Sequence, residues 1–193
     1  RDHYVYIWVI IELFSRKVIA HKISKRNSTQ LITAAFKMAY EERQPPSGLI
    51  FHSDRGAQYT SHRLQQLLHK HNVEQSFSQP GKPHDNSVAE SFFASLKKEE
   101  LYRKDHPSDR AFQASVASYI EFYNTKRPHR TLKNLTPCQT EENFNKNAKW
   151  DSGVRIAWLL CFLLQFEVVW VFSSQIFRGA SIPKNAVRSR LSE

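Results

Sequence analysis

The two apolar segments at the start of the chain constrain its fold most strongly. Residues 3–11 read HYVYIWVII, a β-branched and aromatic run that is typical of a buried strand. Residues 18–24, VIAHKIS, alternate well enough to form a partner strand. The short link between them predicts an antiparallel hairpin, so the chain starts with a sheet.

Helical and strand patterns alternate after this hairpin. Ser28 is a candidate N-cap for a helix that runs to Arg43. The inner face of this helix is predicted to carry Leu31, Ala34, Ala35 and Met38. Further elements are expected as strands at 49–53 and 73–78, a loop at 79–87, and helices at 61–70, 88–103, 109–123 and after Thr136-Pro137. This order predicts an α/β fold with a mixed sheet and flanking helices.

Composition narrows the class of partner. With 193 residues and 40% apolar side chains, the chain is long enough for one domain with a real core. A net charge of +10 favours a polyanionic partner, first nucleic acid and second an anionic membrane. Its two cysteines, Cys138 and Cys161, are too widely spaced for a zinc ribbon, and they fit a reducing cytosol.

Two carboxylates stand where an α/β fold usually places its site. Asp54 follows the strand at 49–53, and Glu90 falls in the first turn of the helix at 88–103. Carboxylates are hard oxygen ligands for Mg²⁺, and two such ions about 3.5–4 Å apart support in-line phosphoryl transfer. The structural alternative stays open, because Asp commonly forms turns and the helix dipole favours an early Glu.

Four blocks of this sequence resemble the catalytic core of insertion-sequence transposases, members of the DDE superfamily that includes retroviral integrases. They are VIIELFSRKVIAHKIS (9–24), HSDRGAQY (52–59), QPGKPHDNSVAESFFASLKKE (79–99) and FYNTKRPHRTL (122–132). The resemblance implies an RNase H-like catalytic core in residues 1–145 and a hydrophobic, basic tail outside the family pattern in 146–193. It also implies that Asp54 and Glu90 are two metal-binding carboxylates, with Mg²⁺ as cofactor and Mn²⁺ as its substitute.

The resemblance further implies a missing element. In this family the first strand is central, lies between the second and fourth strands, and carries the first catalytic Asp. Neither Asp2 nor Glu12 matches that position, and Glu12 is interpreted as structural. We therefore expect unpaired backbone on the two flanking strands and a hole in the core. The chain starts with Arg1, so we expect a longer reading frame, and residues 1–193 alone should be inactive and poorly folded.

Cations near this pair are candidates for binding DNA. Lys97 lies nearly two turns after Glu90 and either reaches a DNA phosphate or is a solvated lysine. In the block at 126–130, Lys126, Arg127 and Arg130 either contact phosphates or form a solvated connector.

Neutral neighbours of the pair have two interpretations as well. Asn86 either contacts substrate or forms a turn. His52 and Ser53 either orient Asp54 through hydrogen bonds or serve as buried residues at the strand end.

The tail contains a strongly apolar segment at 156–172. Its 17 residues include Gln165 and Glu167 and fall short of the length of about 20 that a membrane span needs. No membrane partner is therefore expected, and a helix or strand packed on the core stays open.

Taken together, the residues and the resemblance predict a DNA transposase core that acts by two-metal phosphoryl transfer on element ends and target DNA. The resemblance implies a homo-oligomer when intact, an upstream helix-turn-helix module in the same or a separate chain, and a bacterial cytoplasmic location at the nucleoid. Two alternatives are a non-catalytic DNA-binding remnant that regulates an intact transposase, and an RNase H-like nuclease. Whether this chain is itself an enzyme is left open by the missing first Asp.

Overall fold

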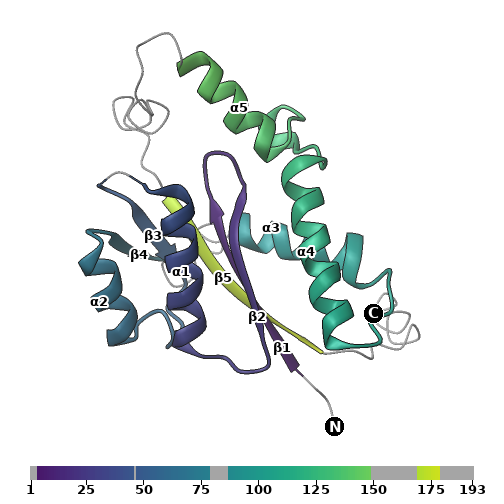
Figure 1. Ribbon diagram of the computed structural model, residues 1–193, viewed down its shortest axis with the longest axis horizontal. Coiled ribbons are helices and arrows are strands. Elements are labelled where there is room, and N and C mark those ends of the chain that lie inside the picture. Colours follow the sequence, from purple (N-terminus) through teal and green to yellow (C-terminus); the bar gives the residue numbers. More distant parts are fainter. Residues whose placement is uncertain (1–3, 46, 79–86, 149–168, 179–193) are drawn as a thin grey trace.

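A single mixed sheet organises the molecule. The computed structural model describes residues 4–45, 47–78, 87–148 and 169–178. Within these ranges the strands are β1 (Tyr4–Glu12), β2 (Val18–Ser24), β3 (Ile50–Ser53), β4 (Glu74–Phe77) and β5 (Val169–Arg178). Their order in the sheet is β2-β1-β5-β3-β4. β1 is antiparallel to β2 and β5, whereas β3 is parallel to β4 and β5 (Figure 1).

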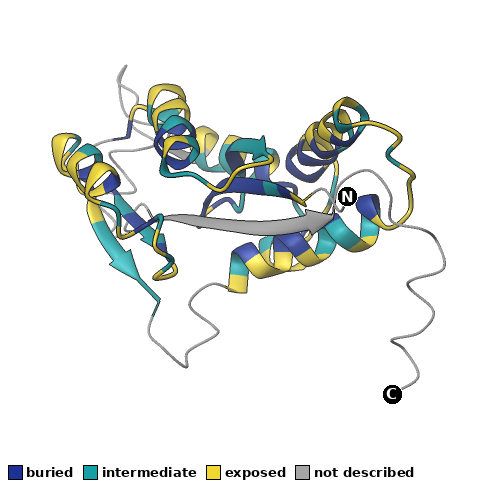
Figure 2. Cartoon of the chain, turned by 90° about the horizontal axis from the view of Figure 1, so that it is seen from below, coloured by how far each residue is buried: buried dark blue, intermediate teal, exposed yellow. Residues whose placement is uncertain are grey.

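Helices cover both faces of this sheet. In chain order they are α1 (Thr29–Arg43), α2 (His62–Lys70), α3 (Ser87–Leu96), the π-helical turn η2 (Lys97–Leu101), α4 (Asp109–Thr125), the 3₁₀ turn η3 (Arg130–Leu132) and α5 (Pro137–Ala148). Figure 1 shows α1 in front of the strands and α3 behind them. In Figure 2 the helices carry buried stretches toward the sheet and exposed stretches away from it. The alternation of strands and helices predicted from the pattern is confirmed.

β1 explains why the opening segment is apolar at almost every position. Its side chains alternate between two cores, with Trp8 and Ile10 in the core under α1 and α2, and Val9 and Ile11 in the core under α3 and α4. All four are fully buried. A strand covered on both faces needs apolar residues at consecutive positions, and residues 3–11 provide them.

The face that α1 turns inward differs from the prediction. Its buried side chains are Ile32, Thr33, Ala35, Phe36 and Ala39. Of the predicted inner residues only Ala35 is buried, and Met38 is 45% exposed. Apolar residues occupy two adjacent faces of this helix. The helix is oriented so that Phe36 reaches Phe51 of β3, with ring centroids 5.9 Å apart.

The centre of the sheet contains the most consequential difference from expectation. β5 lies between β1 and β3, so the predicted unpaired backbone on those two strands is wrong for the described residues. It pairs antiparallel with β1 from Tyr4↔Arg178 to Glu12↔Trp170, and parallel with β3 from Ile50↔Val169 to Ser53↔Phe172. The expected gap is thus filled by a segment of the tail, which forms a strand on the core.

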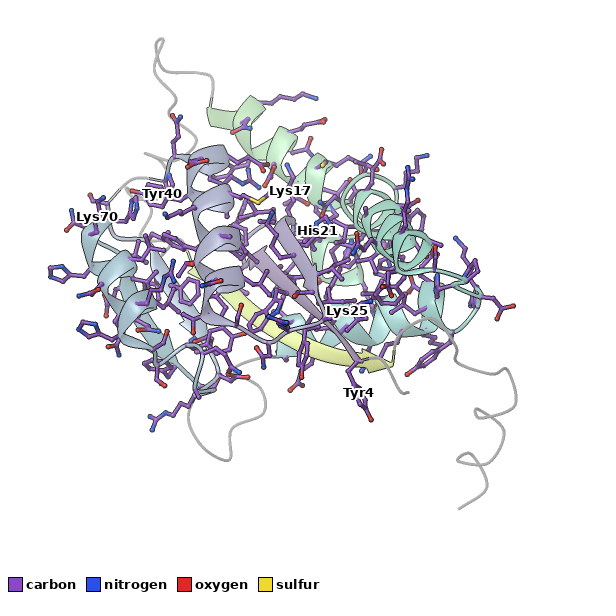
Figure 3. All side chains as sticks on the ribbon, turned by 60° about the horizontal axis from the view of Figure 1, so that its bottom comes forward. Tyr4, Lys17, His21, Lys25, Tyr40 and Lys70 are labelled. Carbon is purple, nitrogen blue, oxygen red and sulfur yellow. The ribbon has the colours of Figure 1, made fainter. Side chains whose placement is uncertain are left out.

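α5 is fastened to the hairpin and to α1 by a polar network. Glu141 accepts from Lys17 Nζ at 2.9 Å and forms an ion pair with Arg43. Burial alone would raise the pKa of Glu141, but the bonds from Arg43 and Lys17 hold that pKa below its usual value. Figure 3 labels Lys17, the partner of Glu141. Glu12 accepts hydrogen bonds from the backbone N–H groups of Phe14 and Ser15 in the turn, which confirms its predicted structural role.

None of the helices in the described part of the chain is long and apolar enough to cross a bilayer. Gln165 and Glu167 of the apolar segment lie outside the described residues, and its last residues form the start of β5.

Candidate active site

Asp54 is an exposed carboxylate directly after β3. Its Oδ1 accepts a hydrogen bond from the backbone N–H of Gly56 at 2.8 Å, so the side chain also shapes the turn. A carboxylate offers about four lone-pair positions, and a single hydrogen bond leaves room for a cation. The turn-forming role and the ligand role are therefore compatible in one residue.

Gly56 allows the backbone to approach this carboxylate closely. A Cβ atom at this position would lie 3.0 Å from Asp54 Oδ1 and 3.4 Å from the ring of Tyr59. Tyr59 is 2% exposed and belongs to the core, and its N–H donates to the Gly56 carbonyl at 2.9 Å. The buried tyrosine thus fixes the turn, and the turn fixes the backbone on which Asp54 stands.

Glu90 is exposed in the first turn of α3. The same helix buries Ala89, Phe92 and Phe93, which anchor it against the sheet and leave Glu90 on its outer side. α3 contacts β5 and β1, and β5 is the sheet neighbour of β3. Asp54 and Glu90 therefore extend from two elements that both contact the central strand.

The side chains of Asp54 and Glu90 are of the right chemical type to bind a divalent cation, but two carboxylates are too few for a complete site. Exposed carboxylates are suitable hard oxygen ligands for Mg²⁺. Nevertheless, the described residues contain no cluster of three or more His, Cys, Asp or Glu side chains arranged to hold a metal ion. Asp54 and Glu90 therefore stay predicted ligands.

His52 and Ser53 form hydrogen bonds around the end of β3. The ring nitrogens of His52 lie 3.1 Å from Ser76 Oγ and 3.1 Å from Ser78 Oγ, so this side chain connects β3 to β4 and the residue after it. Ser53 is fully buried, and its hydroxyl donates to the backbone carbonyl of Asp54 at 3.0 Å. Ser53 thus contacts the backbone of Asp54, and these bonds do not reach its carboxylate.

Arg127 is held by an ion pair within the chain. Its Nε lies 2.9 Å from Glu99 Oε2, and its Nη2 lies 2.7 Å from Glu99 Oε1 and 3.3 Å from Ser95 Oγ. This bond from Arg127, joined by one from Tyr119, lowers the pKa of Glu99. Burial, together with the bond to Glu99, raises the pKa of Tyr119. The guanidinium thereby connects α3 and η2 to the end of α4.

Asn124 was not singled out from the sequence, yet it joins α4 to the sheet. Its Oδ1 accepts from the backbone N–H of Val18 at 3.0 Å, and its Nδ2 donates to the Val18 carbonyl at 2.9 Å. The side chain thus pairs with the edge strand β2 as a neighbouring strand would. The one signal in the sequence that could have indicated this role is that Asn124 is a polar residue next to Tyr123, among the positions of α4 that are buried.

His129 completes the buried part of this block. Its Nε2 lies 3.3 Å from the Tyr123 carbonyl, and its ring stacks edge-on against the ring of Tyr123 with centroids 4.4 Å apart. Burial lowers the pKa of His129, which keeps the ring neutral near pH 7. Burial raises the pKa of Tyr123 to about 12. Tyr59, Tyr119 and Tyr123 are all buried in the core.

The other candidate DNA-binding residues differ in how far they are exposed to solvent. Lys126 and Arg130 are exposed. Lys126 lines a surface hollow of about 650 Å³ between η2 and α4. Lys97 is partly covered, and this burial lowers its pKa. Asn86 lies outside the described residues.

Family comparisons cover most of the described core. Two family models, both described as "Integrase core domain", match residues 1–83 and residues 71–137. Together they extend from before β1 to the start of α5. β5 lies outside both matched ranges.

Curated relatives are bacterial transposases. The chain is 41% identical over 147 residues to transposase InsF for insertion sequence IS3A of Escherichia coli, covering 76% of this chain and 50% of that protein. It is 39% identical over 140 residues to the transposase for insertion sequence element IS904 of Lactococcus lactis, covering 72% and 55%. The chain spans about half the length of the curated relatives it matches.

Solved structures with a similar fold are retroviral integrases. The catalytic core domain of BIV integrase matches with a TM-score of 0.55 at 22% identity, covering 73% of this chain and 89% of that one. The HTLV-2 integrase catalytic core domain in complex with magnesium matches with a TM-score of 0.54 at 17% identity, covering 70% and 83%. At such identities the likeness concerns the fold alone.

Proposed function

The chain belongs to the integrase core domain family of insertion-sequence transposases and has an RNase H-like fold, and from this premise we propose that it is the catalytic core of a DNA transposase. The observation that carries the proposal is the pair of exposed carboxylates at matching motif positions. Asp54 follows β3, Glu90 lies in the first turn of α3, and both elements contact β5. The reaction proposed for the intact protein is cleavage of element ends and their transfer to target DNA.

In this proposal Asp54 and Glu90 would hold Mg²⁺, or Mn²⁺ in its place, and such a cation would supply Lewis-acid stabilisation of the phosphoryl oxygens. The family is dependent on divalent metal ions. Within this chain, the Gly56 N–H orients Asp54 through its bond to Oδ1. The buried side chains of α3 keep Glu90 at the outer side of its helix.

DNA is the proposed substrate, in line with a net charge of +10 and with a family that acts on DNA. Lys126 and Arg130 are the exposed cations of their block and are proposed to contact phosphates, together with Lys97 and, from its motif, Asn86. Arg127 stays a candidate, although its charge is paired with Glu99. A homo-oligomer, an upstream helix-turn-helix module and a location at the bacterial nucleoid belong to the same proposal.

Metal binding tests the carboxylate pair directly. Mn²⁺ affinity is measured for the chain and for Asp54→Asn and Glu90→Gln. Each variant should lose at least about tenfold in affinity, a loss that is usual even for groups outside the ligand set. Asp109→Asn is the matched control, because Asp109 is an acidic residue that pairs with Lys25 at the start of α4. Unchanged Mn²⁺ affinity in both site variants would overturn the assignment.

DNA binding is tested separately through its dependence on salt. Arg130→Ala should lower the slope of log affinity against log salt by about 1, the value for one lost phosphate contact. Arg110→Ala, which removes an exposed arginine from α4, is the control and should leave the slope unchanged. Equal slopes in all three proteins would remove Arg130 from the proposed interface.

A second candidate function is a non-catalytic DNA-binding protein that regulates an intact transposase. The two-carboxylate donor set favours it, since the described residues contain no third acidic partner. Co-expression with an intact relative tests it, and an unchanged transposition frequency would refute it. Cleavage of RNA–DNA hybrids without strand joining would instead favour the nuclease alternative.

A further inference from the structure

The basic segment after α4 alternates between exposed and inward-facing residues. Lys126, Pro128 and Arg130 are exposed, whereas Arg127 is partly covered and His129 is buried. Alternation with a period of two is typical of extended backbone, and His129 has extended dihedrals of φ −115° and ψ 120°. The cations at the two ends of this segment therefore face solvent, and the two inward-facing residues anchor it.

The anchor at Arg127 reaches the helix that carries Glu90. Its Nε and Nη2 bond to the two carboxylate oxygens of Glu99, and Nη2 also lies 3.3 Å from Ser95 Oγ. Ser95 belongs to α3, and Glu99 belongs to η2, which continues α3 without a break. A two-bond fork fixes the angle between its partners as well as their distance. This ion pair therefore orients the basic segment relative to the helix of Glu90.

The π-helical turn η2 holds Glu99 in place for this contact. The Tyr119 hydroxyl donates to Glu99 Oε2 at 2.9 Å, and the Ser115 hydroxyl donates to Glu100. Ser115 and Tyr119 are four residues apart on α4, so they lie on one face of that helix. The bond from Arg127 lowers the pKa of Glu99, which keeps its carboxylate ionised near pH 7. Glu99 is thus a fixed anion to which Arg127 attaches.

We propose that Arg127 is a positioning residue of the DNA interface, which acts through its ion pair with Glu99. The pair holds the basic segment so that Lys126 and Arg130 contact phosphates together, at a fixed place relative to Glu90. The inference rests on the proposed DNA interface and specifies how that interface is built. A phosphate that approached Arg127 would also meet the carboxylate of Glu99, which repels it. Arg127 thus serves DNA binding through its neighbours in the chain.

Removing the charge of Glu99 tests this role, because positioning and simple electrostatics predict opposite results. The affinity of the chain for a short DNA duplex of mixed sequence is measured at several salt concentrations. Glu99→Gln removes a negative charge and no cation, so charge alone predicts equal or tighter binding. Positioning predicts that the slope of log affinity against log salt becomes smaller by about 1, which is about a tenfold loss of affinity at about 0.1 M salt.

Glu121→Gln is the matched control for the change in charge. Glu121 is an exposed carboxylate of α4, and it lines the same surface hollow as Glu99. Both substitutions therefore remove one negative charge from the same region of the surface. Glu121→Gln should leave the slope unchanged and should not weaken binding.

An exchange of the two charges separates positioning from direct contact. Glu99→Arg/Arg127→Glu keeps the net charge and restores an ion pair of opposite polarity, so it should regain most of the slope that Glu99→Gln loses. If Arg127 itself contacted a phosphate, this exchange would lower the slope, and Glu99→Gln would leave it unchanged or raise it. A sample that is partly unfolded binds less DNA but keeps the slope of its folded fraction, so instability does not imitate positioning.

Two outcomes would refute the positioning role. One is an equal slope for Glu99→Gln and Glu121→Gln, and the other is an exchanged chain that binds DNA as weakly as Glu99→Gln does. In both cases the unmodified chain still binds DNA with an affinity that depends on salt, so the proposed function stands. An unmodified chain whose DNA affinity does not depend on salt would instead refute the proposed DNA interface itself.

Discussion

Single residues of the block FYNTKRPHRTL act mainly inside the molecule. Tyr123 and His129 are buried, Asn124 bonds to β2, and Arg127 pairs with Glu99. A pattern of cations and a histidine around a proline suggested phosphate contacts. One of these cations, Arg127, instead holds the end of α4 to Glu99, whereas Lys126 and Arg130 are exposed. Composition alone cannot distinguish these uses, because only packing shows where each charge is directed.

Asn124→Ala should destabilise the chain by about 2–3 kcal/mol. The substitution leaves both polar groups of the Val18 backbone without their buried partner, and unsatisfied buried groups cost that much. Urea unfolding measures the change. Thr125→Ala, which removes a bond from an exposed hydroxyl to the Glu121 carbonyl, serves as the control and should cost far less. Equal losses would show that Asn124 contributes only helix propensity.

The pair of Glu99 and Arg127 should make stability depend on acid. The bond from Arg127 lowers the folded-state pKa of Glu99 from its ordinary value of 4.5. The resulting stabilisation is therefore present above that ordinary value and is lost as pH falls through the folded-state pKa. Since the pair is partly exposed, its size is at most about 1 kcal/mol.

Glu99→Gln tests this dependence. Its loss of stability relative to the unmodified chain should be largest at pH 6 to 7 and should shrink as the carboxylate becomes protonated in acid. Unfolding curves recorded at several pH values measure it. A difference that stays constant down to strongly acid pH would mean that the ionised form of Glu99 contributes nothing.

At the scale of elements, local pattern predicted most helices and strands but not their orientation. β2 has the predicted bounds, and α5 starts after Thr136, whose hydroxyl accepts from Gln139 N–H at 3.1 Å while the Gln139 side chain bonds back. These signals are local. The inner face of α1 is decided by distant partners such as Phe51, and a helix with apolar residues on two faces does not indicate which one will be covered.

Two neighbouring substitutions in α1 test the observed orientation. Phe36→Ala should cost about 3–5 kcal/mol, because the ring is fully buried against β3. Met38→Ala should cost little, since Met38 is 45% exposed. Thermal or urea unfolding compares the two variants. A larger loss for Met38→Ala would restore the face predicted from the sequence.

At the scale of the whole molecule, the order of the strands in the sheet could not be predicted from the sequence pattern alone. The apolar run at 156–172 indicated neither helix nor strand, and no short-range signal links residues 169–178 to residues 4–12. The central place became visible only through the ladders on both sides of β5. The positions of Asp54 after β3 and of Glu90 in the first turn of α3, by contrast, were predictable, because each follows from a local element. Their role as metal ligands stays a prediction.

Truncation after Ala148 should abolish cooperative folding. It removes β5, which leaves the backbones of β1 and β3 unpaired in the middle of the sheet. Circular dichroism and denaturant unfolding should show a loose chain without a sharp transition. Truncation after Arg178 keeps every described strand and is the control. A sharp transition with an unchanged midpoint in the shorter chain would show that β5 is dispensable.

The position of β5 in the chain has a consequence for synthesis. The hairpin of β1 and β2 leaves the ribosome well before β5, its neighbour in the centre of the sheet, because residues 4–24 precede residues 169–178 in the chain. Protein synthesis proceeds at about 5–20 residues per second, so β5 is made roughly 10–30 s after β1, whose edge it pairs with. During that interval the unpaired edge of an apolar strand can pair with other chains. We therefore expect the nascent protein to depend on chaperones more than a protein whose strands pair with sequence neighbours.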